Sequence, residues 1–122
     1  MRILSVTAQK PEKTGSGVYL SELMKGFEKA GCNQALVAGI TSYDTPEIVP
    51  GAAFFPVYFE SEALPFPVVG MSDEMPYKSL RYREMTEEMR EAFLVEFHRV
   101  LNKAVEEFDP ELIICHHLYF LT

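Results

Sequence analysis

Two short clusters near opposite ends of the chain have the residue types that bind small anions and sugars. The first, Gly15-Ser16-Gly17, stands just before an amphipathic segment. Glycines in such a place let the backbone approach a ligand closely, and the N–H groups at a helix start favour an anion. The second, His116-His117, follows a short apolar run. An imidazole there can bind a sugar hydroxyl or a phosphate oxygen.

Neither cluster is a complete catalytic motif. Leu20 occupies the position of the third glycine in a dinucleotide-binding Gly-x-Gly-x-x-Gly, so a plain glycine-rich turn capped by Ser16 stays an alternative. Adjacent residues of an extended backbone point in opposite directions, and one of the two histidines is therefore expected to face a site. No nearby carboxylate or Cys–His spacing completes a set of metal ligands, and we expect no metal.

The remaining polar and thiol groups favour structural explanations. A solvated helix face is expected for Glu87, Glu88, Glu91, Glu106 and Glu107, and a structural role within the same helix for His98. Cys32 and Cys115 stand in or beside apolar runs, which indicates reduced, buried thiols without a disulfide between them.

Strands and helices alternate in the hydrophobic pattern. Apolar runs predict strands at Ile3 to Ala8, Gln34 to Ile40, Ala52 to Phe59 and Leu112 to Cys115. Pro56 lies within the third of these, which predicts an edge position or a bulge. Apolar residues at helical spacing fill the first gap, from Leu20 to a left-handed cap at Gly31. A longer helix is predicted between an N-cap at Thr86 and a stop at Asp109-Pro110, with a long ordered loop or lid over residues 60–82 before it.

This order predicts one Rossmann-like α/β domain over residues 1–122, a mostly parallel sheet with helices on both faces. Right-handed crossovers place the first and last predicted strands side by side. Their carboxyl ends then meet where open α/β sheets bind ligands. The prediction is that Thr14 to Gly17 and His116-His117 share one crevice.

Composition excludes several function classes. The chain has 122 residues with 11 basic and 18 acidic side chains, for a net charge of −7. Nucleic acid is therefore not expected as the main partner, because phosphate neutralisation needs clustered Lys and Arg. No segment has the length and apolar content of a transmembrane span or a signal-peptide core. We expect a cytoplasmic protein.

Two sequence blocks give the chain a family resemblance. Met1-Arg2-Ile3-Leu4, followed by a proline-containing loop and Gly15-Ser16-Gly17, resembles the opening of family 4 retaining glycosyltransferases of the GT-B fold. The run from Phe108 to His117, with Asp109-Pro110 and four apolar residues before the histidines, is similar to a later strand of that family.

The resemblance implies sugar transfer from a nucleotide-sugar donor to an acceptor with retention, without an obligatory metal or a further cofactor. Gly15, Ser16 and Gly17 would lie near the donor phosphates, and His116 would approach the transferred sugar and act in catalysis. His117 would line the acceptor side or support the loop. The family's donor nucleotide is held chiefly by a second Rossmann-like domain. The chain would then be a truncated N-terminal, acceptor-side half that is inactive without the C-terminal domain of the same polypeptide.

Two other functions remain open from the sequence. One is a stand-alone Rossmann-like or flavodoxin-like module that binds a phosphate or sugar ligand without catalysis. The other is an interaction domain in which the proline-rich segment from Leu64 to Pro76 docks a partner.

Overall fold

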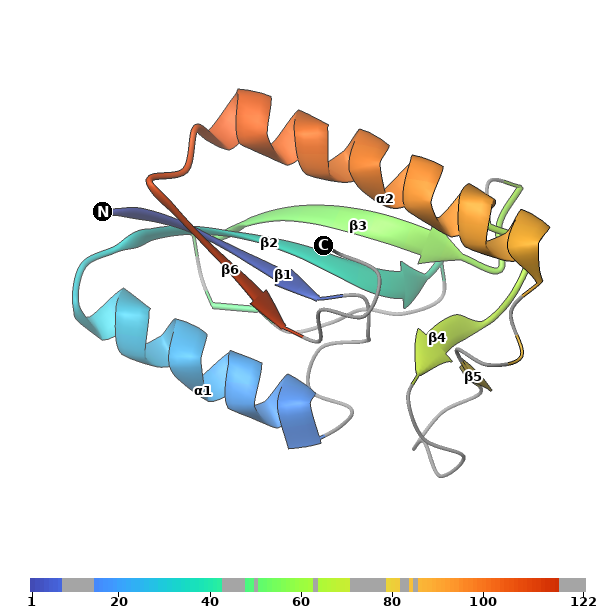
Figure 1. The fold of residues 1–122 in the computed structure, drawn as a ribbon. Coiled ribbons are helices and arrows are strands. Elements are labelled where there is room, and N and C mark those ends of the chain that lie inside the picture. Colours follow the sequence, from blue (N-terminus) through green and yellow to red (C-terminus); the bar gives the residue numbers. More distant parts are fainter. Residues whose placement is uncertain are drawn as a thin grey trace.

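The computed structural model describes residues 1–7, 15–42, 48–49, 51–62, 64–70, 79–81, 84 and 86–116. Along these residues, strands and helices alternate around one main sheet (Figure 1). In chain order the elements are β1 (Arg2–Thr7), α1 (Gly15–Lys29), β2 (Asn33–Thr41), β3 (Ala53–Phe59), β4 (Val68–Gly70), β5 (Ser79–Arg81), α2 (Glu87–Phe108) and β6 (Leu112–His116). No helix within these ranges combines the length and apolar composition that a membrane span requires.

The main sheet has four parallel strands in the order β3-β2-β1-β6. In chain order, β2 pairs with one side of β1, and β3 pairs with β2. The last strand, β6, pairs with the other side of β1. The strand order therefore reverses between β1 and β6. This arrangement confirms the Rossmann-like α/β fold and the predicted pairing of the first and last strands.

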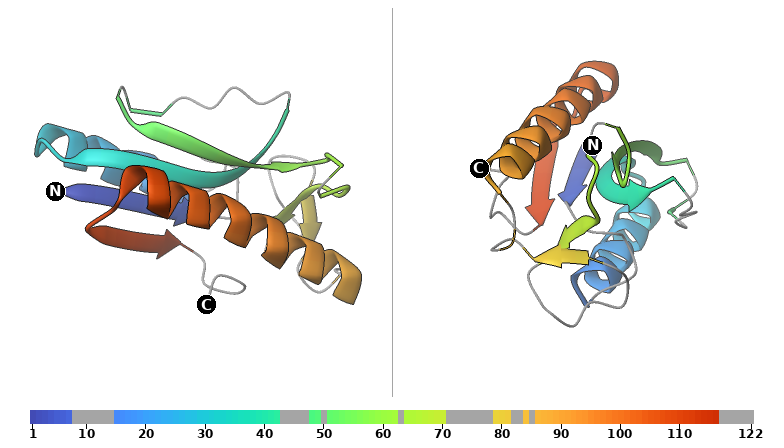
Figure 2. Two further views of the ribbon diagram at one scale, coloured as in Figure 1. Left: turned by 90° about the horizontal axis from the view of Figure 1, so that it is seen from above. Right: turned by 90° about the vertical axis from the view of Figure 1, so that its right-hand side faces the viewer.

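The two helices cover opposite faces of the sheet (Figure 2). Side chains alternate between the faces along each strand, so Leu4 of β1 points toward α2 and packs in a cluster with Phe93 and Phe97. Those two rings stack with centroids 5.4 Å apart. On the other face, Leu20 of α1 packs in a smaller cluster with Leu36 of β2. Burying a large apolar side chain contributes roughly 1.5–3 kcal/mol, so these two clusters hold the three layers together.

The ends of both helices follow the capping signals in the sequence. Thr86 is the N-cap of α2, and its side chain accepts a 3.1 Å hydrogen bond from the amide of Met89. Asp109 ends the helix in the left-handed conformation, with φ 53°. Gly31, just after α1, has φ 80° and confirms the predicted left-handed turn there.

The two edge strands of the sheet, β3 and β6, differ in proline content and in side-chain exposure. β3 contains Pro56 and lies at one edge, as its proline predicts. β6 lies at the other edge and leaves Leu112 and Ile113 exposed. Cys115 is also exposed there, which corrects the expectation of a buried thiol, because an edge strand has a neighbour on one side only. Cys32 is half-buried, and both cysteines are free thiols as predicted.

The segment 60–82 contains regular structure that the sequence pattern did not predict. β4 and β5 pair in parallel as a second, two-stranded sheet. Two other residues of this segment belong to the main core, because Leu64 is fully buried and Phe66 is 6% exposed in the cluster under α2. Neither of these apolar side chains is therefore available to a docking partner, which weakens the interpretation of this segment as a partner-binding surface.

Candidate functional site

Several elements begin or end at the carboxyl edge of the main sheet, which is the side where its parallel strands end. Parallel strands all end at the same edge, so the last residues of β1 and β6, Thr7 and His116, lie together there as register partners. Both helices begin near this edge and run back along the sheet (Figure 1). The predicted site residue His116 thus lies at the point where the strand order reverses.

His116 is the predicted site residue that the structure places most specifically. It is half-buried at the end of β6. Its ring lies 6.2 Å from the ring of Tyr19, measured between centroids, with 63° between the ring planes. Tyr19 belongs to the second turn of α1. This contact joins the end of β6 to the start of α1, two regions about a hundred residues apart in sequence.

The glycine-containing segment begins a helix instead of standing in a loop before it. Gly15, Ser16 and Gly17 are the first three residues of α1, which corrects the prediction that they stand just before the helix. The first N–H groups of any helix lack intrahelical acceptors and attract negative charge. The first turn of α1 contains no acidic residue, so no side chain of that turn offsets this attraction. Thr14 and His117 lie outside the described residues.

The start of α2 differs from the start of α1 in its charge. Glu87 and Glu88 stand in its first turn, and Thr86 accepts a hydrogen bond from a backbone amide there. Carboxylates at this position already offset the positive end of the helix dipole. Of the two helices that begin at this edge, α1 is therefore better suited to an anionic ligand.

Contacts with β2 fix the position of α1 on the sheet. Gln34 is buried and donates a 2.8 Å hydrogen bond from Nε2 to the carbonyl oxygen of Met24. Leu20 packs against the same strand one residue after Tyr19. These contacts hold the helix so that Tyr19 stays beside the end of β6.

Polar side chains on the α1 face of β1 form part of the site that the sequence did not reveal. Ser5 and Thr7 alternate with the apolar residues that face α2, so they point toward α1. Both are buried, and Ser5 Oγ has no hydrogen-bond partner among the described residues. A polar side chain at every second position of a buried strand was the available signal for these two residues. No such signal marked Tyr19, which is defined by its tertiary contact with His116.

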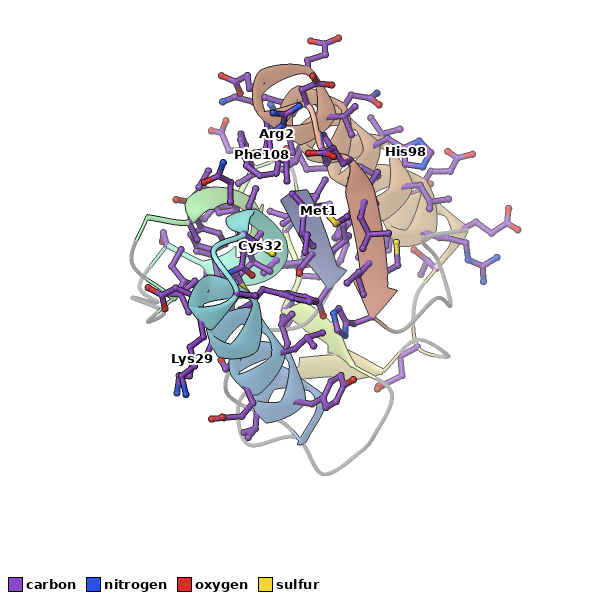
Figure 3. All side chains as sticks on the ribbon, turned by 90° about the vertical axis from the view of Figure 1, so that its left-hand side faces the viewer. Met1, Arg2, Lys29, Cys32, His98 and Phe108 are labelled. Atoms are coloured by element: carbon purple, nitrogen blue, oxygen red, sulfur yellow. The ribbon has the colours of Figure 1, made fainter. Side chains whose placement is uncertain are left out.

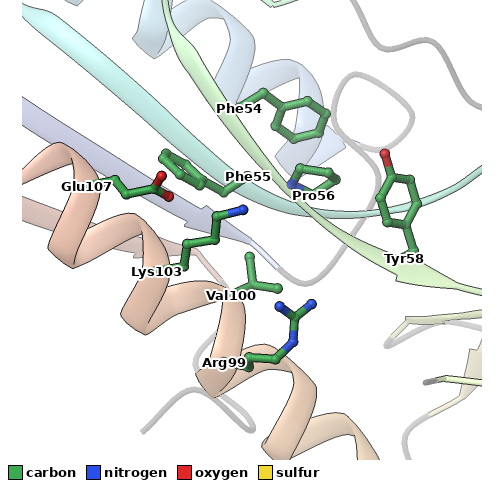
Figure 4. A pocket seen from close by; sticks show the side chains of 8 residues that line it. All are labelled: Phe54, Phe55, Pro56, Tyr58, Arg99, Val100, Lys103 and Glu107. Atoms are coloured by element: carbon green, nitrogen blue, oxygen red, sulfur yellow. The ribbon is translucent and has the colours of Figure 1, made fainter.

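A concave region lies between α2 and β3, the edge strand farthest from β6 (Figure 4). It has a volume of about 290 Å³ and is lined by apolar residues of β3, by Tyr58, and by Arg99 and Lys103 of α2. Arg99 is already hydrogen-bonded to Glu96, which raises the pKa of the Arg99 guanidinium. Because this arginine is paired with Glu96 and Glu107 also lines the groove, the described residues of the region have mixed charge and do not favour an anion.

The other candidate groups lie on the exposed side of α2. His98 is exposed on the outer side of α2, so its expected structural role has no support in packing (Figure 3). The glutamates of α2 named for the solvated face are exposed, as predicted. Within the described part of the chain, no three His, Cys, Asp or Glu side chains converge as metal ligands would.

Comparison of the sequence with protein-family models and with curated proteins gave no match.

Proposed function

We propose that this chain is the N-terminal, acceptor-side domain of a retaining glycosyltransferase of the GT-B fold, which moves a sugar from a nucleotide-sugar donor to an acceptor. The observation that carries the proposal is the position of His116, at the carboxyl end of β6 and against Tyr19 of α1. Ligands of open α/β sheets bind where the strand order reverses, and this histidine lies there. The family resemblance assigns a histidine and a glycine-containing helix start to the same region.

In the proposed reaction, the acceptor oxygen forms a bond to the anomeric carbon of the donor sugar. The bond from that carbon to the phosphate oxygen breaks, the acceptor proton moves to the departing phosphate, and a nucleoside diphosphate leaves. His116 contacts the transferred sugar and stabilises charge that develops during transfer. The first N–H groups of α1, at Gly15, Ser16 and Gly17, attract the donor phosphates. His117 lines the acceptor side.

A transfer assay on the complete product of the open reading frame tests this proposal. The protein is incubated with a panel of nucleotide sugars and acceptors, and the release of nucleoside diphosphate and the anomeric configuration of the product are measured. We expect transfer with retention, and a decrease in kcat on the order of 100-fold in His116→Ala. The matched control is His98→Ala, because His98 is exposed on α2, which packs on the other face of the sheet.

Three results would contradict the proposal: no turnover of any nucleotide sugar, inversion at the anomeric carbon, or equal rates in His116→Ala and the unsubstituted protein. Sugar-phosphate binding without turnover by the complete protein would instead favour a stand-alone binding module. The 122-residue chain alone is expected to be inactive, because the proposed family holds its donor nucleotide chiefly in a second domain.

A further inference from the structure

Tyr19 is largely exposed although its ring takes part in a tertiary contact. Its relative exposure is 62%, although it adjoins Leu20, which is 1% exposed and part of the core. Tyr19 forms no hydrogen bond through its hydroxyl with any described residue, while its ring contacts His116. Core packing therefore explains the position of Leu20 and leaves most of the Tyr19 ring open at the carboxyl edge.

The rings of Tyr19 and His116 meet at a steep angle and so form a corner between α1 and β6. An interplanar angle of 63° at 6.2 Å is an edge-on arrangement within the usual range of aromatic pairs. In a parallel stack, each ring would cover one face of the other ring. In an edge-on pair, the edge of one ring meets the other ring, so more of the ring faces stays accessible. One ring comes from α1, which packs on the sheet, and the other from β6, which is a strand of that sheet, so both backbones are held in place.

The chemistry of this corner suits one face of a sugar ring. A pyranose has a face of C–H groups that packs on an aromatic ring, and hydroxyls at its rim that need hydrogen-bond partners. Tyrosine and histidine each combine an apolar ring with a polar group, which is the combination that such a ligand requires. Tyr19 lies four residues after Gly15, so a phosphate attracted to the start of α1 would be next to it.

We infer that Tyr19 is a substrate-binding residue whose ring, beside His116, packs on the pyranose of a sugar phosphate. This inference rests on the proposed function, because it assumes that the carboxyl edge binds a phosphorylated sugar. It adds the residue that recognises the sugar ring, separately from the helix start that attracts the phosphate.

Two-dimensional NMR titrations of the 122-residue chain with glucose, galactose and mannose 1-phosphates, and with inorganic phosphate, test the inference. Tyr19→Ala should weaken binding of the preferred sugar phosphate about tenfold, with the affinity for inorganic phosphate unchanged. Tyr19→Phe keeps the ring and should stay within about threefold of the unsubstituted chain. Tyr58→Ala is the matched control, because Tyr58 is 46% exposed on β3, the edge strand farthest from β6.

The outcomes separate this inference from the proposed function. If Tyr19→Ala binds the sugar phosphates as well as the unsubstituted chain, or loses inorganic phosphate equally, the inference is overturned. It is also overturned if the unsubstituted chain binds none of the three sugar phosphates. In each case the proposed function is decided independently by transfer and by His116→Ala in the complete protein. Thermal unfolding of Tyr19→Ala should match the unsubstituted chain, because an exposed side chain contributes little to stability.

Discussion

Arg2 donates a 2.8 Å hydrogen bond from Nε to the backbone carbonyl oxygen of Asp109. The backbone of the same arginine also accepts a 2.8 Å hydrogen bond from the amide of Glu111. These contacts connect the start of β1 to the turn before β6, and Figure 3 shows Arg2 beside Phe108 at the end of α2. The two sequence blocks that carry the family resemblance thus touch at the amino edge of the sheet. At the carboxyl edge, the ladder between β1 and β6 ends with Thr7 paired with His116.

Arg2→Met should destabilise the fold by about 1 kcal/mol. The substitution keeps an aliphatic stem but removes a charge-assisted hydrogen bond, whose net contribution is of this order. The midpoint of urea unfolding checks the prediction. Lys25→Met is the matched control, since Lys25 pairs with Glu22 on the exposed surface of α1 and should have a smaller effect. Equal losses in the two variants would contradict a specific role for the Arg2–Asp109 contact.

Asp109 has a conformation that favours glycine. Its φ of 53° and ψ of 64° are left-handed, and its amide donates to the carbonyl oxygen of Val105. Asp109→Gly should raise the free energy of unfolding by up to about 1 kcal/mol, whereas Asp109→Ala should lower it by a similar amount. The ion pair with Arg2 that both variants lose is weak, at 3.5 Å with the Asp109 side chain 87% exposed. Urea unfolding should rank glycine above aspartate and aspartate above alanine, and a more stable alanine variant would contradict the argument.

Residues with a local conformational preference allowed most of the fold to be predicted from the sequence. Thr86 and Asp109 limit α2 because their side chain or backbone satisfies helix ends locally. Pro56 predicts an edge strand because it lacks an N–H group for a ladder. In each case the conformational preference depends on residues that are close together in the sequence, so the sequence pattern is sufficient to predict the structure.

Features that depend on contacts between distant segments were not predictable in the same way. β4 and β5 have three residues each, too few for an alternating pattern to distinguish them from a loop. The exposure of Cys115 follows from the place of β6 at an edge, which no residue of β6 indicates by itself. For the same reason the sequence located His116 at a strand end but did not identify Tyr19 as its neighbour.

Thr86→Ala should lower the free energy of unfolding by about 1 kcal/mol. The substitution removes the oxygen that accepts the 3.1 Å hydrogen bond from the amide of Met89 at the start of α2. Helix content measured by circular dichroism during thermal unfolding gives the shift in Tm. Thr86→Ser is the control, because serine keeps an acceptor at the same position and should restore most of the lost stability. A serine variant as unstable as alanine would show that packing, not the cap, is responsible.

Cys115 should react with alkylating agents at higher pH in the folded chain than in the unfolded one. Partial burial raises the pKa of its thiol, although the residue lies exposed at the sheet edge. Desolvation disfavours the thiolate, which is the reactive form. A Cys32→Ser variant leaves Cys115 as the single thiol, and the pH dependence of its iodoacetamide rate is compared in buffer and in urea.

The same shift in pKa has a consequence for stability. As pH rises above the unfolded thiol's pKa of about 8.5, the unfolded chain loses its proton first, so this contribution to folding stability decreases until the folded thiol also ionises. Cys115→Ser should remove that part of the alkaline destabilisation, measured by urea unfolding between neutral and alkaline pH. An alkylation midpoint in the folded chain at or below that of the unfolded chain would contradict both predictions, because it would mean that the sheet edge favours the thiolate.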